Sequence, residues 1–164
     1  MGPQERPEEL RVWSDLCELV DTVRVLLNRE LRAEVGLTLA ENLVLCQAAM
    51  APERRLRMVE IAAQLHLAKS AITKTVDRLE RRGLLVRQQD PEDRRTVYAA
   101  LTDLGMSTFA DAQPAYLRWL GQHFAGRLDR AELLSLGQAA SAVLHRRLGP
   151  PSRPPVGRLP GKET

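Results

Sequence analysis

Hydroxyl and charged side chains recur on one side of the segment from residue 69 to residue 82. They are Ser70, Thr73, Lys74, Asp77, Arg78 and Arg81. Their spacing of three or four residues places them on one face of a helix, opposite an apolar stripe of Ile72, Val76 and Leu79. Such a polar face can donate hydrogen bonds to the phosphates and base edges of duplex DNA. A solvated amphipathic helix has the same pattern, so the interpretation depends on the neighbouring elements.

The segment after Gly83 has the pattern of a β-hairpin. Residues 84–87 and 96–101 are short and β-prone, and the sequence Asp-Pro-Glu-Asp between them, residues 90–93, is typical of a turn. We call this predicted hairpin the wing. It follows the polar helix directly, so the sequence predicts that the two elements lie close together.

Arginines are concentrated on the wing. Arg94 and Arg95 lie at its tip, and Arg87 lies on its first strand. Basic side chains on such an arm can enter the minor groove of DNA and contact its phosphates. Asp93 would be repelled by DNA, and we expect it to pair with Arg95 and hold that side chain in place.

The charge of the chain is concentrated in the same region. Between Arg54 and Arg95 there are eleven lysines and arginines and six acidic residues, whereas the whole chain has a net charge of only +3. The rest of the chain is therefore slightly acidic. This distribution favours an anionic partner for the central region.

Helices must position these groups, because aromatic residues make up only 4% of the chain and apolar residues recur with helical spacing. We predict a mainly α fold with a small β-hairpin. Capping-box spacing marks two helix starts, at Thr38 with Glu41 and at Asp129 with Glu132. The predicted helices are residues 10–32, 39–51, 60–65, 69–82, 103–123 and 130–144. Residues 1–9 and the proline-rich residues 149–164 are predicted to be disordered tails.

Several classes of protein are disfavoured by the sequence. No run approaches the roughly 20 apolar residues of a membrane helix, and the first nine residues lack the apolar core of a signal peptide, so we expect a cytoplasmic protein. The chain has no glycine-rich phosphate loop, nucleophile elbow or His-Glu-x-x-His motif. We therefore expect no enzymatic activity, no cofactor and no metal site.

The motifs of the central region resemble those of the MarR family of winged helix-turn-helix regulators. The resemblance rests on residues 61–65, 72–84 and 90–95, and above all on Asp93, Arg95, Leu101 and Thr102, which match the family's Asp-x-Arg, β-strand and Leu-Thr pattern. In element order it covers residues 10–148, which we predict to be one domain. Two positions depart from the pattern. Ala68 stands where a Ser or Thr cap is common, and His66 replaces a glycine.

The resemblance implies an intertwined homodimer that binds double-stranded, pseudo-palindromic operator DNA. Residues 10–34 and 102–148 would form the dimerisation region, and residues 38–101 the winged helix-turn-helix lobe. The helix beginning at Lys69 would enter the major groove, and the wing would enter the minor groove. The implied DNA contacts are Lys69, Ser70, Thr73, Lys74, Asp77 and Arg78 on the helix and Arg87, Asp93, Arg94 and Arg95 on the wing.

The resemblance also implies a repressor that responds to a small phenolic or anionic effector bound between the dimerisation helices and the lobe. Trp13 is either a wall of such a pocket or a hydrophobic anchor of the dimer. The main alternative is a redox-sensing regulator that uses Cys17, although residues 27–46 contain no tyrosine to support a reactive thiol. Metal sensing through His66, His123 and His145, and a purely structural helical dimer, are weaker alternatives.

Overall fold

The computed structural model describes residues 7–146, with the side chains of residues 145 and 146 outside the description. Residues 1–6 and 149–164 of the predicted tails therefore lie outside the described residues. For residues 7–9 the prediction of disorder is wrong, because Pro7 caps the first helix and residues 8 and 9 belong to it. The elements in chain order are α1 (Glu8–Val35), α2 (Leu39–Met50), η1 (Pro52–Arg54), β1 (Arg55–Arg57), α3 (Met58–Leu65), α4 (Lys69–Arg81), β2 (Leu85–Gln89), β3 (Val97–Leu101), α5 (Asp103–His123), η2 (Ala125–Arg127) and α6 (Arg130–Arg146).

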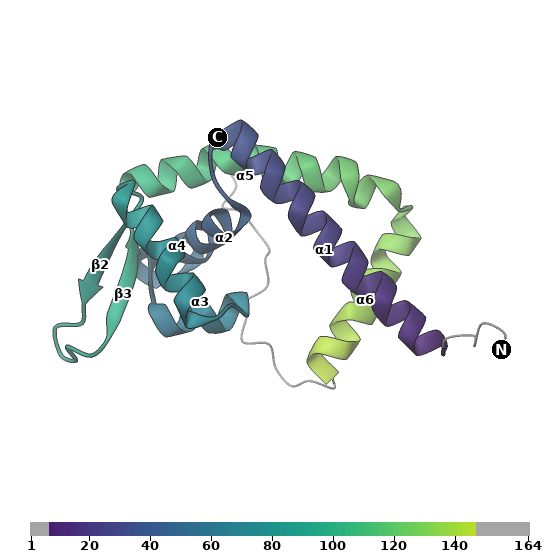
Figure 1. Cartoon of the computed structure of the whole chain (residues 1–164), viewed down its shortest axis with the longest axis horizontal. Coiled ribbons are helices and arrows are strands. Elements are labelled where there is room, and N and C mark those ends of the chain that lie inside the picture. The colour runs from purple at the N-terminus through teal and green to yellow at the C-terminus, as the bar shows by residue number, and fades with distance from the viewer. Residues whose placement is uncertain (1–6, 147–164) are drawn as a thin grey trace, which may run out of the picture.

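The molecule has a lobe at one end and long helices that lead away from it (Figure 1). The lobe contains α2, α3, α4 and a small sheet, and the β2–β3 hairpin projects from it as the wing. Helix α5 begins at the lobe and runs along α1, and α6 turns back at the far end. A mainly α fold with a winged helix-turn-helix lobe is therefore confirmed.

Helix ends follow the local signals in the sequence. The backbone N–H of Thr38 donates to Glu41 at 2.8 Å while the Glu41 N–H donates to Thr38 Oγ1 at 3.1 Å, which confirms the first predicted capping box. Asp129 and Glu132 make the same reciprocal pair at the start of α6. Gly83 has a φ of +70°, so this glycine allows the left-handed turn that ends α4.

The sheet has one strand more than the sequence predicts. Strand β3 is central and pairs antiparallel with β2 on one side and with β1 on the other. In the register, Leu56 of β1 lies opposite Ala99, and Val86 of β2 lies opposite Ala100. Strand β1 has only three residues, Arg-Leu-Arg, which is too short for their alternation to predict a strand, so its structure depends on pairing with a distant strand.

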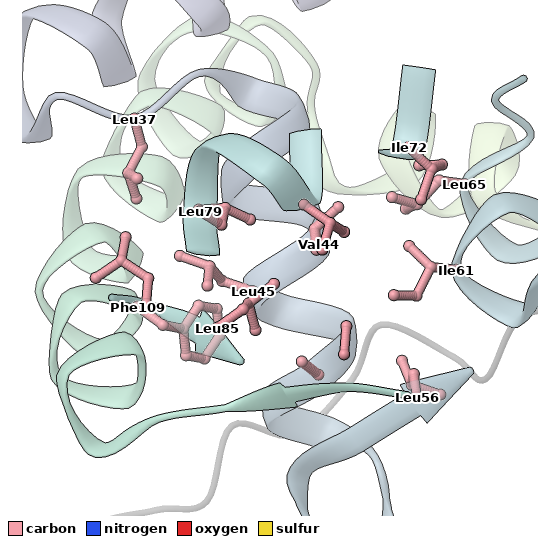
Figure 2. Packing of buried hydrophobic residues seen from close by; sticks show 14 of the residues in the cluster. Leu37, Val44, Leu45, Leu56, Ile61, Leu65, Ile72, Leu79, Leu85 and Phe109 are labelled. Carbon is pink, nitrogen blue, oxygen red and sulfur yellow. The ribbon is translucent and has the colours of Figure 1, made fainter. Parts of the chain in front are cut away.

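Two apolar clusters hold the elements in place. The larger one fills the lobe, where Val44 and Leu45 of α2 meet Ile72 and Leu79 of α4, and it extends to Phe109 of α5 (Figure 2). The smaller one contains Leu27 and Leu31 of α1, Leu39 and Trp119. This second cluster joins the lobe to the long helices, so α1, α2 and α5 form a continuous frame behind α4.

Candidate nucleic-acid interface

Helix α4 presents the predicted polar face to solvent. Ile72, Val76 and Leu79 are buried against the lobe core. In contrast, the residues in the N-terminal half that were predicted to contact DNA are exposed, namely Lys69, Ser70, Thr73 and Lys74. The helix is therefore fixed by one face and leaves an exposed, basic N-terminal half that can enter a groove.

The two positions that depart from the family pattern, Ala68 and His66, both lie in the turn before α4. Ala68 takes the N-cap position, and no side chain caps the helix there. A cap of Ser, Thr, Asp or Asn usually stabilises a helix by ~0.5–2 kcal/mol relative to alanine, so α4 lacks this contribution. His66 ends α3 with a φ of +51°, the left-handed conformation that histidine adopts more easily than most side chains.

The C-terminal half of α4 is held to α2 by an ion pair. Arg78 Nε donates to Glu41 Oε1 at 3.0 Å, and Arg82 Nη1 lies 3.8 Å from Glu41 Oε2. Arg82 also donates to the carbonyl oxygen of Gly36 at 3.1 Å. Arg78, which was predicted to contact DNA, is therefore paired with the buried Glu41 while its own side chain remains 43% exposed, and this pair helps to set the position of α4.

Glu41 is the centre of this contact, and its side chain is only 5% exposed. Burial alone would raise the pKa of Glu41, but the Thr38 N–H and the Arg78 guanidinium outweigh that effect and hold the pKa below 4.5. The carboxylate is thus charged at neutral pH. The capping-box spacing identified Glu41 as a cap, but nothing in the sequence indicated its second role as the partner of Arg78.

Arg87 joins the wing to α4. Its Nη2 lies 2.5 Å from Asp77 Oδ1, and its Nη1 pairs with Glu80 Oε2. The backbone N–H of Arg87 also donates to Glu80 Oε1 at 3.1 Å. Asp77 and Arg87 were both predicted to contact DNA, and the structure brings them together with each other. Their direct contact with DNA stays a prediction, and the geometry favours a positioning role.

The wing turn is built on two aspartates. Asp90 Oδ1 accepts the backbone N–H groups of Glu92 at 2.8 Å and Asp93 at 3.1 Å, and these bonds lower the pKa of Asp90. Asp93 accepts the backbone N–H of Arg95 at 3.0 Å and the hydroxyl of Thr96 at 2.9 Å. The predicted ion pair between Asp93 and the Arg95 guanidinium is wrong, because among the described residues Asp93 binds the Arg95 backbone and the Thr96 hydroxyl and forms no ion pair with that guanidinium.

Sequence reasoning missed a second group of residues beside the wing. Arg57, at the junction of β1 and α3, donates from Nε to the Tyr98 hydroxyl at 3.4 Å, and Tyr98 donates to Asp90 Oδ2 at 3.1 Å. The guanidinium carbon atoms of Arg55 and Arg57 lie 4.8 and 5.9 Å from the centre of the Tyr98 ring. The local excess of arginine was the available signal, but the pairing of β1 with β3 was needed to place these residues.

The remaining predicted site residues lie away from this face. Trp13 is 65% exposed on α1, where it borders a shallow hollow formed by residues of its own helix. Cys17 lies half-buried on the same helix. A larger hollow, of about 470 Å³, lies between α1 and the lobe and is lined by Arg24, Asn28 and Gln64 among others. Trp13 is not one of its lining residues.

Comparison with known proteins agrees with this geometry. A family model described as MarR family matches residues 37–97. The crystal structure of Sco3205 from Streptomyces coelicolor, a MarR family transcriptional regulator in complex with DNA, is 30% identical and has a TM-score of 0.79, with 89% of this chain and 94% of that chain covered. The chain belongs to the MarR family of transcriptional regulators.

Two further relatives extend the comparison. CouR from Rhodococcus jostii RHA1, solved with bound p-coumaroyl-CoA, is 26% identical to this MarR-family chain, with a TM-score of 0.71 and coverage of 86% of this chain and 96% of that chain. An uncharacterised regulator of Bacillus subtilis, YkoM, is 39% identical over 70 residues, which are 43% of this chain and 46% of YkoM. The curated relatives it matches are each aligned over less than half of their length.

Membrane-spanning helices and metal clusters are both absent from the described residues. Within residues 7–146, no helix combines the length and apolar character needed to cross a bilayer. In the same part of the chain, no three His, Cys, Asp or Glu side chains gather in a way that could hold a metal ion. Neither finding bears on the residues outside that range.

The buried Glu41 carboxylate predicts a pH-dependent stability. Its pKa is lowered by folding, so its contribution is present above pH 4.5 and is lost as the pH falls through the folded-state value. We expect Glu41→Gln to lower the free energy of unfolding by about 1.5–3 kcal/mol at pH 7, as for a hydrogen bond to a charged group. The difference from wild type should shrink below pH 4.5, as measured by urea denaturation across pH.

Glu34→Gln is the matched control, because Glu34 pairs with Arg118 in an exposed ion pair on the long helices. Exposed pairs contribute about 0–1 kcal/mol, so this variant should differ little from wild type at any pH. An effect of Glu41→Gln that was equally large at pH 7 and at strongly acidic pH would contradict the proposed charge state of Glu41.

Proposed function

We propose that this MarR-family protein is a repressor that binds a pseudo-palindromic operator as a homodimer and releases it when a small anionic effector binds. The observation that carries the DNA-binding part is the division of α4 into two halves. Glu41 and Arg87 hold its C-terminal half, while Lys69, Ser70, Thr73 and Lys74 remain exposed at the N-terminal half. In a winged helix, the N-terminal residues of this helix contact base edges.

The wing supports the same proposal. Arg94 and Arg95 are exposed at its tip, and the backbone around them is fixed by the hydrogen bonds of Asp90 and Asp93. A preformed turn reduces the ordering entropy that binding would otherwise cost. These arginines are therefore suited to the narrow, electronegative minor groove next to the major groove that α4 would enter.

The exposed apolar residues on the long helices support the homodimer. Trp13, Leu16 and Val20 of α1 lie on one helical stripe and are exposed, as are Leu133, Leu134 and Leu144 of α6. Soluble monomers rarely expose a contiguous apolar surface of this kind. A second copy of the chain would cover it with the same residues under two-fold symmetry, and two lobes would then match a two-fold operator. The exposure of Trp13 favours its role as a dimer anchor.

The hollow between α1 and the lobe supports an effector site. Its volume of about 470 Å³ falls in the range of small-molecule sites, roughly 300–1,000 Å³. Arg24 supplies a cation at its edge, and Gln64 Oε1 is buried without a hydrogen-bond partner in the described part of the chain. Because α1 and α3 both line the hollow, a bound anion would change how the lobe sits on the long helices. CouR, a structural relative, was solved with bound p-coumaroyl-CoA, which is a precedent for a ligand that is both aromatic and anionic.

DNA binding is tested by comparing two kinds of variant on the DNA upstream of the protein's own gene, with an unrelated duplex as competitor. Arg95→Ala should weaken binding to both duplexes and reduce the salt dependence, because it removes a cation from the minor groove. Thr73→Ala and Lys74→Ala should instead relax sequence preference, with a loss of about 1–3 kcal/mol at individual operator positions. Equal losses of affinity on specific and unrelated DNA would contradict base contacts by Thr73 and Lys74.

The homodimer is tested by Trp13→Glu, which would place a charge in the proposed apolar interface. We expect this variant to become monomeric at concentrations where wild type is dimeric, as measured by light scattering after size exclusion. Leu104→Glu is the control, because Leu104 is also exposed, at 57%, but lies at the lobe end of α5. A Trp13→Glu protein that stays dimeric would show that another surface forms the interface.

The effector site is tested with a panel of phenolic carboxylates, using the rise in melting temperature and the release of bound operator DNA. We expect compounds that stabilise wild type to lose this effect with Arg24→Met, because the guanidinium that attracts the carboxylate is gone. Arg29→Met, which removes another exposed arginine of α1, should keep the response. Equal responses of Arg24→Met and wild type would show that the effector binds at another site.

A further inference from the structure

A third hollow lies where the start of α3, the face of α4 and the wing meet. It has a volume of about 420 Å³. Its lining includes Arg57 from the β1–α3 junction, Thr73 from α4, and Arg87, Arg95 and Val97 from the wing. The two elements predicted to contact DNA, α4 and the wing, are therefore two walls of one hollow, and Arg57 belongs to a third wall that the sequence did not predict.

The position of this hollow relative to the two grooves indicates what it faces. Thr73 is a predicted major-groove contact, and Arg95 is a predicted minor-groove contact. Adjacent major and minor grooves are separated by one sugar–phosphate backbone, so a protein that reaches into both must straddle that backbone. The hollow between Thr73 and Arg95 is where the backbone would pass.

The charges around the hollow favour the same occupant. The guanidinium of Arg87 is already paired with both Asp77 and Glu80, and the three groups together carry a net negative charge, so they do not attract an anion. Within the part of the chain that the structure describes, Arg57 and Arg95 form no ion pair. These two arginines leave their cationic groups available on opposite sides of the hollow.

Arg57 is also held in place before any ligand binds. The Tyr98 hydroxyl accepts its Nε–H at 3.4 Å, and Tyr98 is fixed in turn by its hydrogen bond to Asp90 at 3.1 Å. The carboxylate of Asp90 also receives two backbone N–H groups of the wing turn. The hydrogen-bond chain from Asp90 through Tyr98 thus positions Arg57 while its two terminal nitrogens remain able to bind phosphate oxygens bidentately.

We propose that this hollow binds a backbone phosphodiester of operator DNA, and that Arg57 is its principal ligand. Arg95 approaches the same strand from the minor-groove side, and the exposed apolar side chain of Val59 forms a surface for the adjacent deoxyribose. This inference rests on the proposed function, because it names the DNA group that one part of the interface recognises. The contact fixes register and orientation and carries no sequence information by itself.

The test uses the full-length protein and two kinds of duplex. On an unrelated duplex, Arg57→Met should reduce the slope of log K against log salt by about 0.9 for each phosphate that the protein no longer neutralises. Methionine keeps an unbranched stem beside Tyr98, and circular dichroism checks that the variant is folded. On the operator, neutral methylphosphonate groups placed one at a time should weaken wild type at one phosphate in each half-site. The affinity of Arg57→Met should not change when a methylphosphonate replaces that same phosphate.

Two further variants distinguish a direct phosphate contact by Arg57 from the effect of its positioning by Tyr98 and from the general effect of losing one positive charge. Tyr98→Phe removes the hydroxyl that holds Arg57 but keeps the cation, so binding should weaken while the salt slope stays close to that of wild type. Arg29→Met removes the same charge from α1 and should leave the methylphosphonate pattern unchanged.

The possible failures are distinguishable. A wild-type protein that binds no duplex tightly would contradict the proposed function itself. A wild type that binds the operator, together with an Arg57→Met variant of equal salt slope and equal methylphosphonate pattern, would overturn only the phosphate hollow. If the hollow binds free phosphate instead, inorganic phosphate should stabilise wild type but not Arg57→Met, and the salt slope of DNA binding should be the same for both proteins. This result too would overturn the proposal.

Discussion

The contact of Arg87 with Asp77 and Glu80 is the interaction on which the geometry of the interface depends. Asp77 and Glu80 stand three residues apart on α4, where two carboxylates repel each other unless a cation lies between them. Arg87 supplies that cation from the wing, and its side chain is only 30% exposed. The same contact therefore removes a local repulsion on α4 and fixes the direction of the wing. The contact thus ties α4 to the wing, which are two of the walls of the hollow.

Several acidic residues near the interface bind donors of their own chain. Glu41 pairs with Arg78, while Asp90 and Asp93 hold the wing turn. Their carboxylates are turned toward donors of their own chain, and the cations that remain exposed, such as Lys69 and Arg95, face outward. This arrangement combines a modest net charge with a concentrated basic surface.

Much of the fold could be predicted because its signals are local. Capping boxes at Thr38 and Asp129 and the glycine at position 83 act within a few residues, and the structure confirms each of them. Strand β1 could not be predicted, because its three residues become a strand only by pairing with β3, more than 40 residues later.

In the candidate site, too, features with local signals could be predicted and features that depend on distant residues could not. Helical spacing correctly identified the outer face of α4, but it could not show which arginines of that face have an acidic partner elsewhere in the fold. Arg78 finds Glu41 at a separation of 37 residues, and Arg57 is brought to the wing by its hydrogen bond to Tyr98 across 41 residues. Side chains whose partners are distant in sequence are visible only in the folded chain.

The missing cap at Ala68 bears on the balance between the stability of the fold and the activity of the residues on α4. Alanine at the N-cap forgoes ~0.5–2 kcal/mol on the very helix that carries the exposed polar groups. Proteins need only enough stability to stay folded, and residues that serve activity are often not those that serve stability. The start of α4 is therefore a place where thermostability can be gained by a single substitution at the N-cap.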